Sequence, residues 1–173
     1  MQIVVELASA LTAELRGSLQ SSIDREFGQI EIVRAHRWAE PTWVVLGYDD
    51  DRLVSSLAVV DRHATADDQP LHLMGLSNVI TEPAGRGRGY SRRLNAAALE
   101  LMARQDPASL GMLFCADSLV SFYASLGWQP FRGSVMVSQP AGDRLWSSNC
   151  MVHTLGQQRS VAFQQVHLRG LPW

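Results

Sequence analysis

Apolar residues in the first part of the chain follow two spacings, one typical of strands and one typical of helices. Residues 2–7 carry β-branched side chains and predict a short strand. Apolar residues then recur every four positions from Leu11 to Ile23, which predicts a helix over residues 10–27 with Ser9 as its N-cap. Residues 29–40 fit neither spacing clearly and are ended by Pro41.

The middle of the chain shows the alternation that is typical of strands. Residues 42–48 and 52–61 predict two strands, and the aspartate run at 49–51 predicts a solvated hairpin turn between them. Residues 63–70 are polar and predict a connection to a further strand over residues 71–81. Within that strand the apolar phase slips across Gly75, which predicts a β-bulge.

Later segments mix helices with strands. Residues 95–100 lie on an apolar helix that must end before Asp106 and Pro107. The elements predicted after it are a buried strand at 110–115, a short helix at 118–125, and strands at 131–138, 149–155 and 161–168. The sequence therefore predicts a fold that combines helices with a sheet.

Composition narrows the class of protein. With 173 residues, of which 46% are hydrophobic, the chain is predicted to form a single domain over residues 1–173. A net charge of −2 argues against nucleic-acid and anionic-membrane partners. No apolar run approaches the roughly 20 residues of a membrane span, and the amino end lacks a signal-peptide pattern, so a cytoplasmic protein is expected. Cys115 and Cys150 lie in apolar runs and are expected to be buried free thiols.

A glycine-rich turn precedes the apolar helix and has the chemistry of a phosphate site. It reads Arg86-Gly87-Arg88-Gly89-Tyr90-Ser91. A glycine-rich turn that opens a helix leaves backbone N–H groups free, with the positive end of the helix dipole behind them. The chain contains no lysine, which excludes a P-loop, and the turn lacks the third glycine of the dinucleotide-binding motif.

Two motifs resemble those of the GNAT N-acetyltransferase superfamily. In its acetyl-coenzyme A loop, Arg/Gln-x-x-Gly-x-Gly/Ala, the matching positions are Arg86, Gly89 and Ser91, with serine in place of glycine or alanine. The segment from Phe122 to Trp128, FYASLGW, resembles the second GNAT signature. The two motifs occur in the right order, so the resemblance implies an α+β GNAT fold. Its sheet is mixed and mostly antiparallel, flanked by helices, with a bulge that splays the parallel fourth and fifth strands.

The resemblance also implies a cofactor and its binding residues. Acetyl-coenzyme A would place its pantetheine arm along the edge of the fourth strand, at Val79, Ile80 and Thr81. Its pyrophosphate would be held by the turn, at Arg86, Gly87, Arg88, Gly89, Tyr90 and Ser91. The reaction implied is direct acetyl transfer to an amine through a tetrahedral intermediate, with catalysis largely by positioning.

The catalytic residues are implied less completely. Tyr123 matches the tyrosine that protonates the leaving thiolate in the superfamily. The glutamate that many members carry on the fourth strand is replaced by Ser77, which could hold a relay water. Glu82 lies near, but alternation places it on the other face. The carboxylate of Trp173 and that of Asp117 remain further candidates for the base.

Three functions stay open on the sequence alone. The first is acetyl transfer to a small-molecule amine, because the last hundred residues loosely resemble aminoglycoside 2'-N-acetyltransferases and so imply a link with antibiotic resistance. The second is acetylation of a protein or peptide amine, and the third is acyl-CoA binding without turnover. A polycationic acceptor would require that Asp24, Glu26, Asp117 and Asp143 converge.

Other expectations concern partners and site walls. Trp38 and Trp43 are candidates for the wall of a substrate site, and a core role for them is equally open. The five histidines form no metal-binding pattern, so no metal is expected. Homodimers are common in the resembled superfamily, and a homodimer is expected by analogy.

Overall fold

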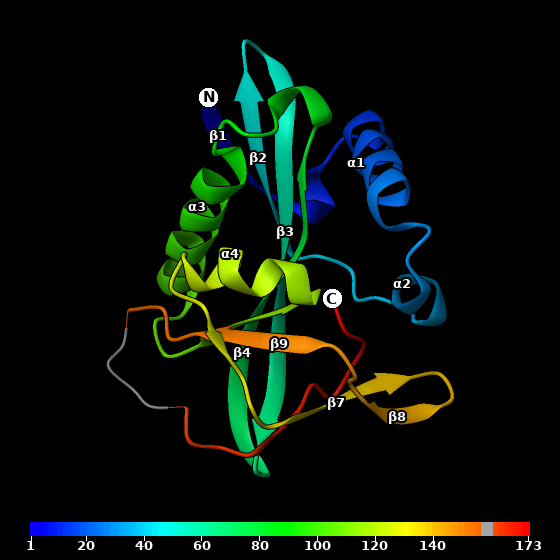
Figure 1. Ribbon diagram of the computed structural model, residues 1–173, viewed down its shortest axis with the longest axis vertical. Coiled ribbons are helices and arrows are strands. Elements are labelled where there is room, and N and C mark those ends of the chain that lie inside the picture. Colours follow the sequence, from blue (N-terminus) through cyan, green and yellow to red (C-terminus); the bar gives the residue numbers. More distant parts are fainter. Residues whose placement is uncertain (157–160) are drawn as a thin grey trace.

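The computed structural model describes residues 1–156 and 161–173 and forms one curved sheet with helices on both faces (Figure 1). The strands are β1 Gln2–Leu7, β2 Trp43–Asp49, β3 Arg52–Ala66, β4 Gln69–Thr81, β5 Leu110–Cys115, β6 Gln129–Pro130, β7 Ser134–Gln139, β8 Gly142–Leu145, β9 Asn149–His153 and β10 Gln165–His167. The helices are α1 Ala13–Phe27, α2 Glu31–Ala35, α3 Tyr90–Gln105 and α4 Val120–Ala124, with short 3₁₀ turns at Ala8–Ala10, Pro83–Gly85 and Asp117–Leu119.

The sheet is mixed, as predicted. Its strands follow the order β6-β9-β5-β4-β3-β10-β7-β8, while β2 also pairs with β3 and carries β1 on its outer edge. The pairs β4–β5 and β7–β10 are parallel, and the others are antiparallel. The predicted α+β fold with a parallel fourth and fifth strand is therefore confirmed.

Three apolar clusters hold the helices to the sheet. One lies between the sheet and the helices α3 and α4, and includes Met74, Leu94 and Trp128. A second, with Leu73, Trp146 and Trp173, lies on the opposite face, where Ile32 of α2 also packs. The third covers that same opposite face beneath α1. Alternation along the strands explains this division, since neighbouring residues point to opposite faces.

Strands β4 and β5 pair over a short stretch and then separate. Their paired residues run from Leu73 with Leu110 to Leu76 with Leu113. Beyond that point β4 continues to Thr81 beside β3, whereas β5 continues beside β9. We call this divergence the fork. The predicted splaying of the fourth and fifth strands is thus confirmed.

The bulge that accompanies the fork lies three residues from its predicted position. Gly75 stands in regular register with Val60, so the prediction of a bulge at Gly75 is wrong. The register shifts opposite Leu57, and Asn78 there takes a positive φ of 48°. Gly75 has a different reason to be glycine: a Cβ on it would lie 2.1 Å from the indole of Trp173. The change in the alternation of apolar residues across Gly75 reflects this packing against Trp173.

Two predicted boundaries are also wrong. Helix α1 begins at Ala13 and not at residue 10, because Ser9 lies in a 3₁₀ turn and Thr12 caps the helix by accepting the N–H of Leu15. Residues 63–70 are no connection, since β3 runs through Ala66 and β4 starts at Gln69. Asp67 and Asp68 form the turn with φ of 45° and 65°, the positive values that a type I′ hairpin turn needs.

In the last third of the chain, the predicted element boundaries agree only approximately with the structure. The helix predicted at 118–125 is a 3₁₀ turn followed by α4, and the predicted strand at 161–168 shortens to β10. Both cysteines are buried free thiols, as predicted. No helix in the described ranges is long and apolar enough to cross a membrane.

Candidate functional site

The fork exposes one edge of β4 along the residues predicted to meet the cofactor. Residues 77–81 pair with β3 on one side, and their pairing with β5 has ended at Leu76. An unpaired strand edge presents backbone N–H and C=O groups to any extended ligand laid beside it. The edge at Val79, Ile80 and Thr81 therefore offers main-chain hydrogen bonds, although the Ile80 carbonyl also accepts one from the Ser55 hydroxyl.

The glycine-rich turn opens α3 with free space in front of it. Gly87 and Gly89 take φ of 78° and 74°, and no heavy atom lies within 4 Å of a Cβ built on either. Gly89 is the N-cap of α3, and in the described chain no side chain caps the N–H groups of the first turn. Uncapped donors of this kind can bind an anion, and the role predicted for Tyr90 and Ser91 in holding the pyrophosphate stays a prediction.

The arginines of the turn differ in their surroundings. Arg86 makes two hydrogen bonds of 2.8 Å to Glu26 of α1, and its Nε donates to the Thr81 carbonyl. Arg88 is more loosely held, 3.8 Å from Asp49. Arg86 therefore ties the turn to α1, while Arg88 is freer to meet a phosphate.

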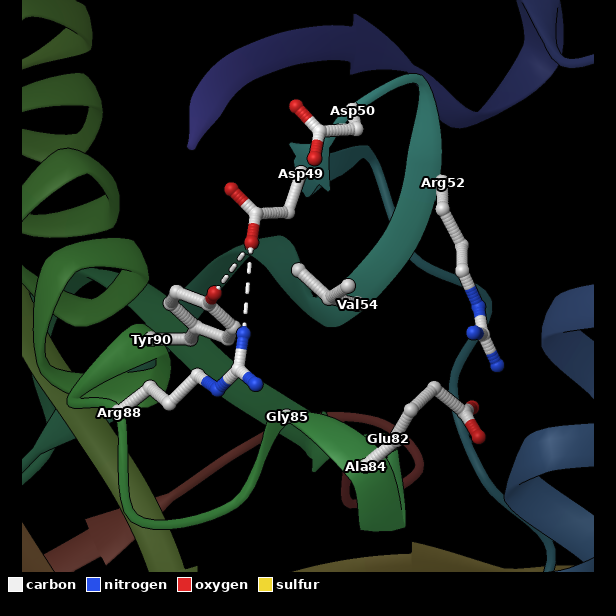
Figure 2. Close-up of a pocket in the computed structure, with 9 residues that line it drawn as sticks. All are labelled: Asp49, Asp50, Arg52, Val54, Glu82, Ala84, Gly85, Arg88 and Tyr90. Carbon is white, nitrogen blue, oxygen red and sulfur yellow. Dashed lines mark hydrogen bonds and ion pairs between the residues drawn. The ribbon is translucent and has the colours of Figure 1, made fainter.

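Tyr90 fixes the start of α3 against the hairpin between β2 and β3. Its hydroxyl donates a 2.6 Å hydrogen bond to Asp49, as Figure 2 shows. This bond, first among several favourable interactions, lowers the pKa of Asp49. The cavity of about 260 Å³ beside these residues lies between the hairpin and the turn, and not in the fork.

Two arginines that the sequence reasoning missed lie in the first turn of α3. Arg92 holds its guanidinium 5.4 Å from the centre of the Phe122 ring in α4. Arg93 donates to the carbonyl of Met1. Basic residues at a helix N-terminus oppose the helix dipole. That local conflict is the signal that could have pointed to a bound anion, because such conflicts concentrate at functional sites.

Tyr123 lies on the α4 side of the fork. Its side chain is 6% exposed and packs with Cys115 and Trp128 in the cluster beneath α3 and α4. Burial, with a smaller effect from Cys115, raises the pKa of Tyr123. The phenol therefore keeps its proton at neutral pH.

The candidates for the base fall on the opposite face. Ser77 lies two residues beyond Gly75 and shares its face, toward α1. Glu82 also points to α1, because the bulge at Asn78 resets the alternation, so the predicted face of Glu82 is wrong. Both of its oxygens lie 2.8 Å from Arg25, and Ser22 donates to one of them. Both oxygens of Glu82 are therefore engaged within the protein.

Trp173 closes the base of the fork on that same face. Its side chain is 5% exposed, lies over Gly75 of β4, and donates its indole N–H to the Met112 carbonyl of β5. The neighbouring Pro172 carbonyl accepts the N–H of Ala39. The packing therefore holds Trp173 at the point where β4 and β5 separate.

The other predicted site residues lie in different parts of the molecule. Trp38 packs with Trp173 in the cluster opposite α3, whereas Trp43 packs beneath α3. The four acids do not converge: Asp24 accepts from Gln20, Glu26 from Arg86, Asp117 from Asn149, and Asp143 from Ser138 and His167. In the part of the chain that the structure describes, no group of acids, histidines or cysteines is suited to a metal ion.

Comparison with known proteins agrees with this geometry. A family model described as an acetyltransferase (GNAT) domain matches residues 14–131. Crystal structures of two Escherichia coli proteins share the fold. ElaA has a TM-score of 0.62 at 16% identity over 88% of this chain and 99% of its own. The GNAT family N-acetyltransferase YhbS, in complex with CoA, has a TM-score of 0.63 at 14% identity over 97% and 90%.

A curated relative adds a narrower similarity. The aminoglycoside 2'-N-acetyltransferase of Mycolicibacterium fortuitum is 30% identical over 90 residues, which are 52% of this chain and 45% of the relative. The match thus spans less than half of that relative's length. The family model, in contrast, covers most of this chain, and the chain belongs to the GNAT acetyltransferase family.

Proposed function

We propose that this protein is an acetyl-CoA-dependent N-acetyltransferase that acts on a primary amine of a small molecule. The observation that carries the proposal is the fork placed beside an uncapped, glycine-opened helix N-terminus. One feature can hold an extended thioester arm, and the other can hold its diphosphate. Membership of the GNAT family supports the same chemistry.

Each residue then has a role. Acetyl-CoA supplies an activated acetyl thioester, and an amine attacks it through a tetrahedral intermediate. The amides of residues 87–91, with Arg88 and Arg92, hold the phosphates, and the edge of residues 79–81 aligns the arm. Tyr123 delivers the proton that the departing thiolate takes up. Positioning of this kind supplies most of the rate.

The route of the amine proton is part of the proposal. Ser77 can hold a water on the acceptor face, but a hydroxyl is no base at neutral pH. A catalytic role for Trp173 stays a prediction. A homodimer and a cytoplasmic location also remain predictions.

A single assay tests the proposal. Release of the coenzyme A thiol is followed with acetyl-CoA across a panel of amines that includes kanamycin-type and kasugamycin-type sugars. Turnover that depends on an amine supports the enzyme. Tight CoA binding without turnover of any amine would instead support the second candidate, a non-catalytic acyl-CoA-binding domain, which the neutralised Glu82 favours.

A further inference from the structure

Resting on the acetyltransferase function proposed above, we propose that the acceptor is a monoamine with an aromatic ring. The ring packs on a set of side chains that we call the aromatic wall: His36, Trp38, Phe114 and Trp146. The similarity to an aminoglycoside acetyltransferase favours a polycationic sugar instead, so the two ideas differ in their substrate.

The wall lies on the face of the fork opposite α3 and α4. Helices α3 and α4 pack on one face, where Cys115 and Tyr123 are buried. In this proposal the amine approaches from the other face, toward which Phe114 points. Phe114 is the first residue of β5 beyond the last pair with β4, so its ring stands at the fork itself.

The rings form a continuous surface that leads away from the fork. The centre of the Phe114 ring lies 5.6 Å from Trp173 and 4.5 Å from Trp146. Trp146 in turn meets Trp38 at 5.9 Å and His36 at 5.4 Å in edge-on contacts. These are the separations at which aromatic rings attract one another, and a further ring can extend the series.

The wall is more than buried core. Trp146 is nearly buried, but Phe114, Trp38 and His36 are only half-buried and keep part of each ring exposed. The indole N–H of Trp146 is buried with no hydrogen-bond partner among the described residues. Leaving this donor unpaired costs free energy, and a ligand atom reaches it only when the half-buried rings beside it move apart.

The charges near the fork oppose a polycation. On the α1 side, Glu82 is bound by Arg25 and Glu26 by Arg86, each through two 2.8 Å hydrogen bonds. A sugar with several ammonium groups needs several uncompensated carboxylates. A single amine on an aromatic body needs only the apolar surface that the wall provides.

The test compares three acceptors that each carry one amine, two aromatic and one aliphatic, with one polycationic sugar. The wild-type protein is assayed for acetyl-CoA-dependent thiol release with 2-phenylethylamine, tryptamine, n-butylamine and kanamycin. We expect kcat/KM for the two aromatic amines to exceed that for n-butylamine and for kanamycin by about tenfold or more.

Variants test whether residues of the aromatic wall determine the preference for aromatic amines. Phe114→Leu and Trp38→Leu should each raise KM for tryptamine about 3- to 10-fold and leave the Kd for CoA unchanged. Phe163→Leu is the matched control, because Phe163 is half-buried in the same cluster but packs on Phe131. If Phe114→Leu fails to fold, Trp38→Leu carries the test.

The outcomes separate the inference from the function beneath it. Turnover of kanamycin ahead of tryptamine, or equal effects of Phe114→Leu and Phe163→Leu, overturns the aromatic acceptor and upholds the acetyltransferase. Absence of turnover with every amine overturns both, and absence of CoA binding in addition rejects the donor site as well.

Discussion

At the scale of single residues, burial and partners decide what each side chain can do. Tyr123 lies in an apolar setting that keeps its phenol protonated, whereas Glu82 and Glu26 are fixed by arginines. The protonated phenol of Tyr123 comes from α4, on one face of the sheet. On the other face, the carboxylates of Glu82 and Glu26 are each paired with an arginine.

Replacing Tyr123 with phenylalanine tests the acid role. The ring and its packing remain, but the proton donor is lost, so kcat should fall about 100-fold, the lower end for general acid–base catalysis. The Kd for CoA should change less than about twofold, measured by calorimetry. An unchanged kcat would remove Tyr123 from the mechanism.

His72 gives a pH dependence that is independent of catalysis. Its two ring nitrogens lie 2.6 Å from Asp106 and Asp61, and His63 stacks on it at 5.1 Å. Burial alone would lower the pKa of His72, but the two hydrogen-bonded carboxylates outweigh it and raise the pKa. The protonated ring therefore stabilises the fold fully below its ordinary pKa of about 6.5, and the stabilisation fades as pH rises through the folded-state pKa.

The variant His72→Gln should lose stability in a pH-dependent way. Its deficit in unfolding free energy relative to wild type should be larger at pH 5.5 than at pH 9, measured by urea denaturation. The second histidine–carboxylate contact, between His167 and Asp143, is the same in both proteins, so the difference between them reports on His72. A deficit that grows with pH would contradict the assignment.

The positions of single residues were predictable where the pattern is local. Gly89 and Ser91 lie at the start of a helix and Tyr123 on a short helix, as the motifs indicated, while their roles stay predictions. The contact of Arg86 could not be predicted, because its partner Glu26 is 60 residues away in sequence and meets it only after α1 packs on the sheet. Phe114 and Trp146 carried no signal, since apolar residues in strands are ordinary core.

At the scale of elements, the start of α3 is the proposed donor site. Gly89 can take a positive φ because it has no Cβ, and the N–H groups of the first turn that follows it have no side-chain cap in the described chain. An alanine there would cost about 1–2 kcal/mol in the left-handed region.

Two glycine-to-alanine variants test this claim together. Gly89→Ala should weaken CoA binding about tenfold as the turn relaxes to avoid that cost. Gly17→Ala lies in the interior of α1, where a Cβ meets nothing within 4 Å, and should raise the unfolding free energy by about 0.5–1 kcal/mol. Calorimetry and denaturation measure the two effects. CoA affinity that is equal in both variants would refute the role of Gly89.

Elements were predictable in type more often than in extent. The local patterns gave β1, β2, β5 and α1: β2 and β5 are apolar runs buried on both faces, and α1 repeats apolar residues every four positions. The run 63–70 was misread since its polar side chains face outward on a hairpin that extends beyond the main body (Figure 1). The adjacent aspartates at 67 and 68 were the available sign of that turn.

At the scale of the whole molecule, the fork depends on segments far apart in the chain. The bulge at Asn78 bends β4 along β3, while β9 holds β5, and Trp173 bridges both strands where they part. The resemblance in two short motifs predicted that the strands separate. It could not predict what lines the acceptor face, because that face is assembled from α2, β5, the turn before β9 and the last residues.

Hydrogen exchange of backbone amides, with and without CoA, tests the central claim most directly. The account predicts that CoA slows exchange in two stretches, residues 77–81 at the open edge of β4 and residues 87–91 at the start of α3, and leaves the paired core of β3 unchanged. Exchange that stays the same in both stretches at saturating CoA, or protection confined to the cavity beside Asp49, would contradict it.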